Sequence, residues 1–319
     1  MRLRLHRLGI ALESADAPVR AAWAELFDGW LEESPAEADV CLRLALRPAL
    51  PAPPPKPPVF DDSHLWPDGV GVLRVYDAPD GVLLHFANAG QVSVPLSAVN
   101  ARPEPIEGVV VPGVFRYGRF EDVTLTSLAP ALRRQGYFLL HAFTAARDGR
   151  CVLIVGPTGS GKTTTGLNLI LSGWGLLAND AVVLEQRQDV IYALPTPGSI
   201  GVRAGTFDLL PALAAQLDVD GQAAVEVPAA RLVAGEWALP TPAAALLFPE
   251  LTDGQESTAE PLPPAVALAR ALAESADRWD LPMLDAHVSL LGHLCRQARP
   301  YALRLGRDMN QLARLIATL

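Results

Sequence analysis

The sequence predicts an α/β protein, in which a smaller N-terminal α+β domain (residues 1–120) precedes a larger domain of alternating strands and helices (residues 121–319). Three observations favour this division. Short stretches of alternating polarity fill the first part, and several prolines gather at residues 101–115. In the second part a continuous apolar run, Cys151–Val155, leads through a glycine-rich loop into a helical stretch. A short apolar run of this kind is typical of a strand that is buried on both faces of a sheet.

The first domain is expected to contain strands and one amphipathic helix. Alternation of apolar and polar residues indicates half-buried strands, and apolar residues spaced three and four apart after Pro18 indicate the helix. The segment RPALPAPPPKPP is too rich in proline for a helix or a central strand, so it predicts an extended connector; a partner-docking polyproline ligand is the alternative. The expected elements are strands over 3–12, 40–46, 70–76 and 82–86, a helix over 18–31 and the connector over 47–58.

The second domain is expected to begin with a helix and to end in helices. Apolar runs after the glycine-rich loop indicate strands, two of which flank a polar turn and predict a β-hairpin. The C-terminal region is expected to be mostly helical. The predicted strands cover 151–155, 176–178, 181–184 and 190–194, and the predicted helices cover 125–135, 163–171, 264–276, 281–298 and 308–318.

Composition and charge argue against several classes of partner. The chain carries 26 Lys+Arg against 35 Asp+Glu, a net charge of −9, which disfavours nucleic acid and an anionic membrane surface. No apolar run is long enough to cross a bilayer, and Arg7 interrupts the apolar N-terminus, so we expect no signal peptide and a cytoplasmic location. The three cysteines, Cys41, Cys151 and Cys295, lack metal-ligand spacing and are expected to be buried free thiols.

The most informative segment is GPTGSGKT, which fits the Walker A or P-loop pattern G-x-x-x-x-G-K-[ST] between a strand and a helix. The glycines allow the backbone to curl so that successive N–H groups point inward, where they and the helix N-terminus suit phosphate oxygens. Lys162 is expected to reach the β- and γ-phosphates, and the hydroxyl of Thr163 to coordinate Mg²⁺. The expected nucleotide contacts are Gly156, Pro157, Thr158, Gly159, Ser160, Gly161, Lys162, Thr163 and Thr164.

Chance is a poor explanation of this motif. From the frequencies of Gly, Lys and Ser/Thr in the chain, an accidental match is expected on the order of once in a thousand chains. The protein uses arginine almost everywhere it needs a cation, and its only lysines are Lys56 and Lys162. Arginine would fit this loop poorly, because its planar fork is bulky. A glycine-rich turn with an incidental lysine is therefore the weaker alternative.

The loop predicts nucleotide binding but does not by itself define the reaction. No guanine-reading N-K-x-D segment is present, which favours ATP with Mg²⁺ over GTP, and the signature of ABC transporters is absent too. The string GPTGSGKTTT resembles that of secretion and pilus-retraction ATPases. That resemblance stops at the string, since the downstream acidic and histidine boxes of those ATPases are missing.

A second resemblance extends further along the chain. Leu139–His141 before the loop and Gly173–Asp180 (GWGLLAND) after it resemble the C-terminal catalytic domain of the HPr kinase/phosphorylase family. The histidine lies 21 residues before Lys162 and the aspartate 18 residues after it, offsets that match the family. The resemblance is good over residues 135–205 and loose over the rest of the C-terminal half. It implies a P-loop catalytic domain of the PEP-carboxykinase/HPr-kinase type.

The resemblance also implies roles for single residues. Asp180 would be the general base that takes the proton from an acceptor hydroxyl, and with Thr163 it would contribute to Mg²⁺ binding. His141 would lie near Asp180 and tune its charge or position. Arg203 would match the arginine of the family's E-I-R-G segment. Other interpretations stay open: a turn-capping aspartate, a structural histidine, and a solvated arginine at a strand edge.

Departures from the family pattern bear on the expected activity. The family's paired aspartates become Asn179 and Asp180, its metal-binding glutamate falls at Gly201, and neither its phosphorylase loop nor its usual N-terminal domain is recognisable. The expected activity is ATP-dependent phosphorylation of a Ser/Thr hydroxyl on a protein or peptide, with HPr itself an insecure acceptor. The alternatives are a nucleotide-binding regulatory or assembly module and a P-loop ATPase without phosphotransfer. The resemblance leaves a homo-oligomer open.

Overall fold

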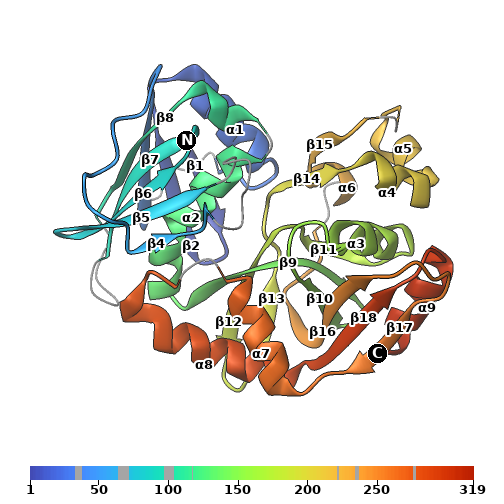
Figure 1. Ribbon diagram of the computed structural model, residues 1–319. Helices are drawn as coiled ribbons and strands as arrows, with labels where there is room; N and C mark the ends of the chain where they lie inside the picture. The colour runs from blue at the N-terminus through green and yellow to red at the C-terminus, as the bar shows by residue number, and fades with distance from the viewer. Residues whose placement is uncertain are drawn as a thin grey trace. The chain divides into compact units, whose positions relative to one another are not determined.

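The computed structural model shows a mixed α/β protein with two large sheets (Figure 1). It describes residues 1–32, 38–63, 72–96, 104–116, 118–220, 223–233, 237–275 and 278–319. The chain divides into two compact units, Met1–Gly136 with Asp277–Leu284, and Tyr137–Ala276 with Asp285–Leu319. The predicted domain boundary between residues 120 and 121 stays a prediction. Among the described residues, no helix combines the length and the apolar character needed to span a membrane.

The first unit is built on a sheet with the order β1-β2-β3-β8-β7-β6-β5-β4. The prediction of one strand over 3–12 was wrong, because the chain turns at His6, whose φ of +58° lies in the left-handed region, and forms a hairpin instead. Residues 47–58 form neither helix nor strand, as predicted, and residues 70 and 71 of the predicted strand over 70–76 lie outside the described residues. The strands are β1 (Arg2–Leu5), β2 (Leu8–Glu13), β3 (Val40–Leu46), β4 (Phe60–Asp61), β5 (Leu73–Ala78), β6 (Gly81–Phe86), β7 (Gly90–Pro95) and β8 (Ile106–Val110).

The helices of the first unit bury aromatic and charged side chains. In α1 (Ala17–Leu26) Trp23 packs on Phe27, with 4.4 Å between ring centroids, so these aromatic residues belong to the core. The chain next forms η2 (Pro112–Phe115) and α2 (Arg119–Arg134). At the end of α2, Arg133 and Arg134 donate to the fully buried carboxylate of Asp280 at 2.8 Å. Burial raises the pKa of Asp280, but the two arginines hold it below its usual value, so the carboxylate stays charged and anchors its segment in this unit.

The second unit is built on a sheet with the order β10-β9-β12-β13-β16-β18-β17, in which β11 also pairs with β9 and β10 with β16. β10, β16 and β18 are mutually parallel, so their carboxyl ends lie at one edge of the sheet, which we call the carboxyl edge. The strands of this sheet are β9 (Tyr137–Arg147), β10 (Arg150–Val155), β11 (Gly175–Ala178), β12 (Ala181–Arg187), β13 (Val190–Leu194), β16 (Thr241–Leu251), β17 (Thr258–Pro261) and β18 (Arg299–Leu305). A separate two-stranded sheet pairs β14 (Ser199–Val202) with β15 (Val225–Pro228).

Helices cover the second sheet. The predicted hairpin is confirmed as β12 and β13, and the predicted C-terminal helices are α7, α8 and α9. The prediction of a mostly helical C-terminal region was wrong in part, because the region also contains the strands β16, β17 and β18. A short apolar run such as residues 243–248 does not distinguish a buried strand from a buried helix. The helices are α3 (Lys162–Leu171), α4 (Ala204–Leu209), α5 (Pro211–Leu217), α6 (Ala230–Val233), α7 (Pro264–Ala273), α8 (Leu281–Gln297) and α9 (Met309–Thr318).

The core of the second unit places α3 directly on the sheet. Side chains from α3 and α9 share one cluster with one face of β9, β10, β16 and β18, and α3 lies next to β9 in Figure 1. On the opposite face, the guanidinium of Arg270 in α7 lies 5.7 Å from the ring centre of Phe248. All three cysteines are free as predicted, although Cys41 is only half-buried. The sheet therefore lies between two helical layers.

Gly166 allows the close approach of α3 to β9, because a Cβ atom at this position would collide with the ring of Phe143. We expect Gly166→Ala to lower the free energy of unfolding by about 1–3 kcal/mol, since overpacking outweighs the better helix propensity of alanine. Denaturant titration measures this change. Gly205→Ala is the matched control, because Gly205 lies in α4 and a Cβ atom there meets nothing within 4 Å. Equal stability of the two variants would show that the contact does not constrain α3.

Candidate functional site

The glycine loop, Gly156–Gly161, connects β10 to α3 at the carboxyl edge. Gly159 and Gly161 have φ angles of +85° and +99°, a region that side-chain-bearing residues rarely adopt. A Cβ atom on Gly161 would also lie only 2.6 Å from Cδ1 of Leu305. Both the backbone conformation and the lack of space for a side chain therefore require glycine at position 161. The N–H groups in the first turn of α3 face the loop.

Lys162 is the first residue of α3, and it is buried. Its Nζ atom donates to the main-chain carbonyl oxygens of Gly156 and Pro157, the latter at 3.1 Å. Burial lowers the pKa of Lys162, while the negative charges of Asp180 and Glu274 oppose that shift. The structure therefore holds an ammonium group against the glycine loop and within electrostatic reach of two carboxylates.

Asp180 lies at the level where the glycine loop begins. Both β11 and β12 run antiparallel to β9, and Asn179 and Asp180 form the short interruption between them. The carbonyl oxygen of Asp180 accepts from the backbone N–H of Ala142 at 3.1 Å, and Ala142 also pairs with Val155, the last residue of β10. The side chain of Asp180 is exposed, so it is accessible to a ligand at the carboxyl edge.

His141 joins this group from β9, where it pairs with Ala181. Burial lowers the pKa of His141, the charge of Lys162 lowers it further, and Asp180 opposes both. The imidazole is therefore neutral at pH 7. Lys162, Asp180 and His141, which are separated in the sequence, act on one another electrostatically in the folded protein.

Two buried polar atoms beside this group have no hydrogen-bond partner. They are the hydroxyl oxygen of Ser160 in the glycine loop and Oδ1 of Asn179, whose Nδ2 atom donates to the carbonyl oxygen of Ser199 at 2.8 Å. An unpaired buried polar atom is costly, so its presence suits a site that a polar ligand completes. A phosphate oxygen could accept from the Ser160 hydroxyl.

Glu274 was not among the residues predicted from the sequence. β17 runs antiparallel to β18, so the chain leaves the carboxyl edge along β17. The next element, α7, leads back toward this edge, and Glu274 follows the last residue of α7. Burial raises the pKa of Glu274, and the charge of Lys162 lowers it. No local sequence signal marks this residue, since only the path of the chain through β17 and α7 brings it near Lys162.

Arg203 occupies a neighbouring but less defined position. It immediately precedes α4, and its carbonyl oxygen accepts from the N–H of Thr206 at 2.9 Å. The hydroxyl of Thr206 lies 2.8 Å from that of Thr164 in α3. The backbone of Arg203 is thus linked to the helix after the glycine loop, but its side chain is exposed.

The residues predicted for Mg²⁺ offer hard oxygen donors. These are the hydroxyl of Thr163, which is half-buried, and the carboxylate of Asp180. Within the described part of the chain, no group of three or more His, Cys, Asp or Glu residues could hold a metal ion. Mg²⁺ commonly uses one or two protein ligands together with phosphate oxygens and water, so this donor set fits it.

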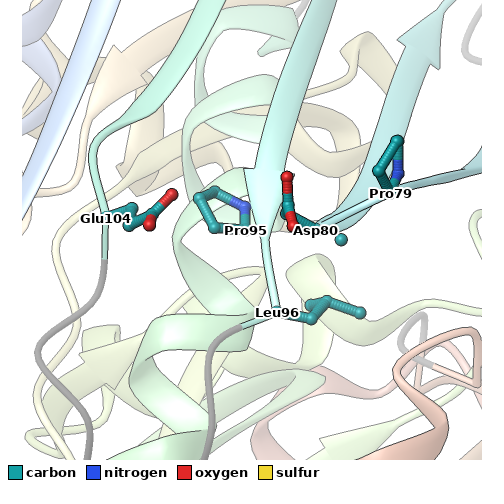
Figure 2. A pocket seen from close by; sticks show the side chains of 6 residues that line it. Pro79, Asp80, Pro95, Leu96 and Glu104 are labelled. Atoms are coloured by element: carbon teal, nitrogen blue, oxygen red, sulfur yellow. The ribbon is translucent and has the colours of Figure 1, made fainter.

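A hollow of about 450 Å³ lies elsewhere, in the first unit, beside the turn between β5 and β6 and the end of β7. Figure 2 shows the carboxylates of Asp80 and Glu104 among its lining side chains. The remaining lining residues are Pro79, Gly81, Pro95 and Leu96. This lining contains two acids and no cation, so it is unsuited to a polyphosphate.

Comparisons with known proteins give limited further information. No family model matches the chain, and no curated protein matches it. Among solved structures, it is similar to the HPr(Ser) kinase/phosphatase from Coxiella burnetii, with a TM-score of 0.30 and 14% sequence identity. That similarity covers 56% of this chain and 94% of the other.

Proposed function

We propose that this protein is an ATP-dependent phosphotransferase that acts on a Ser/Thr hydroxyl of a protein or peptide, as HPr-type kinases do. The observation that carries the proposal is the convergence of Lys162, Asp180 and His141 at the glycine loop, although His141 and Asp180 lie 39 positions apart in the sequence. Phosphoryl transfer needs a cation and amide donors on the phosphates and a carboxylate near the attacking hydroxyl. These groups surround the carboxyl edge of the second unit.

The main-chain amides of the glycine loop and the first turn of α3 bind the triphosphate, and the Ser160 hydroxyl adds a donor. The ammonium of Lys162 exchanges the carbonyl oxygens of Gly156 and Pro157 for phosphate oxygens, which compensate its charge better. Thr163 and Asp180 would hold Mg²⁺, which when bound neutralises charge on the β- and γ-phosphates. Arg203 supplies further positive charge from the start of α4.

Asp180 positions the acceptor. Its carboxylate takes the proton of the acceptor hydroxyl while the hydroxyl oxygen forms a bond to the γ-phosphorus. The bond between that phosphorus and the β–γ bridging oxygen breaks, and ADP leaves with the electron pair. The neutral imidazole of His141 orients Asp180 without removing its negative charge.

Transfer of labelled phosphate tests this function. The full chain is incubated with Mg²⁺, γ-labelled ATP and an extract of the source cells in which endogenous kinases have been inactivated by heat. We expect label on a polypeptide, recovered as phosphoserine or phosphothreonine after acid hydrolysis. Binding of ATP without any labelled acceptor would instead favour the nucleotide-binding regulatory or assembly module.

A further inference from the structure

Leu251, the last residue of β16, leaves 68% of its surface exposed beside the glycine loop. A Cβ atom built on Gly161 would lie 3.3 Å from Cδ2 of Leu251 and 2.6 Å from Cδ1 of Leu305, which ends β18. The two leucines therefore form an apolar patch, the Leu251 patch, that touches the loop immediately before Lys162. An exposed leucine at this place has an apolar face available to a ligand of the loop.

The backbone around the patch is held in place. The N–H and the hydroxyl of Thr252 both donate to the carbonyl oxygen of Leu305, at 3.0 and 2.9 Å. The N–H of Gly306 donates to the hydroxyl of Ser257 at 3.0 Å, and a Cβ atom on Gly306 would collide with the carbonyl of Gln255. The loops after β16 and β18 thus brace each other, and the patch is preformed rather than assembled by a ligand.

The position of the patch relative to Asp180 defines a direction across the site. β10 has β9 on one side, which carries His141 and pairs with the strands around Asp180, and β16 on the other side, which ends at Leu251. Ligands of open α/β sheets lie across the carboxyl ends of the strands. When the last phosphate lies beside Asp180 and the triphosphate crosses the glycine loop away from β9, the rest of the nucleotide extends toward β16.

We propose, on the basis of the proposed function, that the Leu251 patch is the subsite for the adenine base of ATP. The flat face of a purine is apolar and packs on aliphatic side chains, while its edge stays free for polar contacts. Binding the base covers the exposed side chain of Leu251 and removes apolar surface from water on both partners. The patch gives affinity for the nucleoside part of ATP, and the glycine loop gives affinity for its phosphates.

The test separates the two parts of the ligand. Calorimetry measures the affinity of the full-length protein for Mg-ATP and for Mg²⁺ with inorganic tripolyphosphate, which has the phosphates but no base. We expect Leu251→Asn, which is uncharged, to weaken ATP binding about tenfold, the effect of removing an apolar contact of this size. Its affinity for tripolyphosphate should stay within about twofold of the wild type, because the loop is intact.

The matched control is Leu239→Asn. Leu239 is 80% exposed and precedes β16, at the end of the strand opposite to Leu251, so its replacement should change neither affinity. Unchanged ATP binding in Leu251→Asn would overturn the subsite, as would equal losses for ATP and tripolyphosphate. A wild-type protein that binds neither ligand would instead overturn the proposed function, and the subsite with it.

Discussion

Lys162→Ala is expected to weaken the binding of Mg-ATP about 100-fold, since it removes a charge-assisted hydrogen bond to the phosphates from a buried place. The ammonium is already in the loop, at the carbonyl oxygens of Gly156 and Pro157, so it needs little reorganisation to reach a phosphate. In the alanine variant the triphosphate keeps the amides of the loop but loses the positive charge of the ammonium. The nearby carboxylates of Asp180 and Glu274 then repel the triphosphate. Calorimetric titration with Mg-ATP measures the loss.

The chain provides a matched control for this variant in its only other lysine. Lys56 is exposed in the first unit and donates to the carbonyl oxygen of Asp77 at 2.7 Å. Lys56→Ala changes the net charge by the same amount as Lys162→Ala, so unchanged ATP binding in this variant would show that the effect is local. If Lys162→Ala bound ATP as the wild type does, the glycine loop could not be the phosphate site.

Asp180→Asn is expected to reduce phosphoryl transfer about 10²–10⁴-fold while ATP affinity changes by less than about threefold. The amide keeps the size and the place of the side chain and an oxygen that can still coordinate Mg²⁺, but it cannot take the proton of the acceptor hydroxyl. Lys162 remains to hold the phosphates, so binding and transfer separate in this variant. Single-turnover transfer from γ-labelled ATP, alongside calorimetry, measures both quantities.

Asp189→Asn serves as the control for this second substitution. Asp189 is exposed in the turn between β12 and β13, at the opposite end of β12 from Asp180, and its replacement removes one negative charge as well. We expect transfer at the wild-type rate. Full transfer activity in Asp180→Asn would rule out the assignment of Asp180 as the base and leave it as a turn residue.

Some residues of the candidate site can be recognised from a local sequence motif, and others cannot. The glycine loop is local, because a strand, three glycines and a helix follow one another in the chain, and Gly159 and Gly161 adopt backbone conformations that favour glycine. His141 and Asp180 were predicted as site residues only from the resemblance to a family. Their position near Lys162 depends on the pairing of β9 with β10, β11 and β12. Their catalytic roles stay predictions.

The elements that the sequence analysis missed share a physical cause. β9 and β16 are long strands buried within a sheet, so they lack the alternation that identifies a half-buried strand. The hairpin of β1 and β2 was taken for one strand because a residue other than glycine makes the turn. For β9 and β16, pairing with distant segments of the sheet decides the structure, whereas for β1 and β2 the backbone conformation of His6 decides it.

The sequence by itself determined the strands and the helix between residues 151 and 194, the glycine loop and the presence of one lysine at its end, since these depend on neighbouring residues. Only the tertiary structure decided that the charge of Glu274 acts on Lys162 and that Leu251 lies exposed beside Gly161. These pairs of residues lie about one hundred positions apart in the sequence, and the order of strands in the sheet, which no local pattern encodes, brings them together.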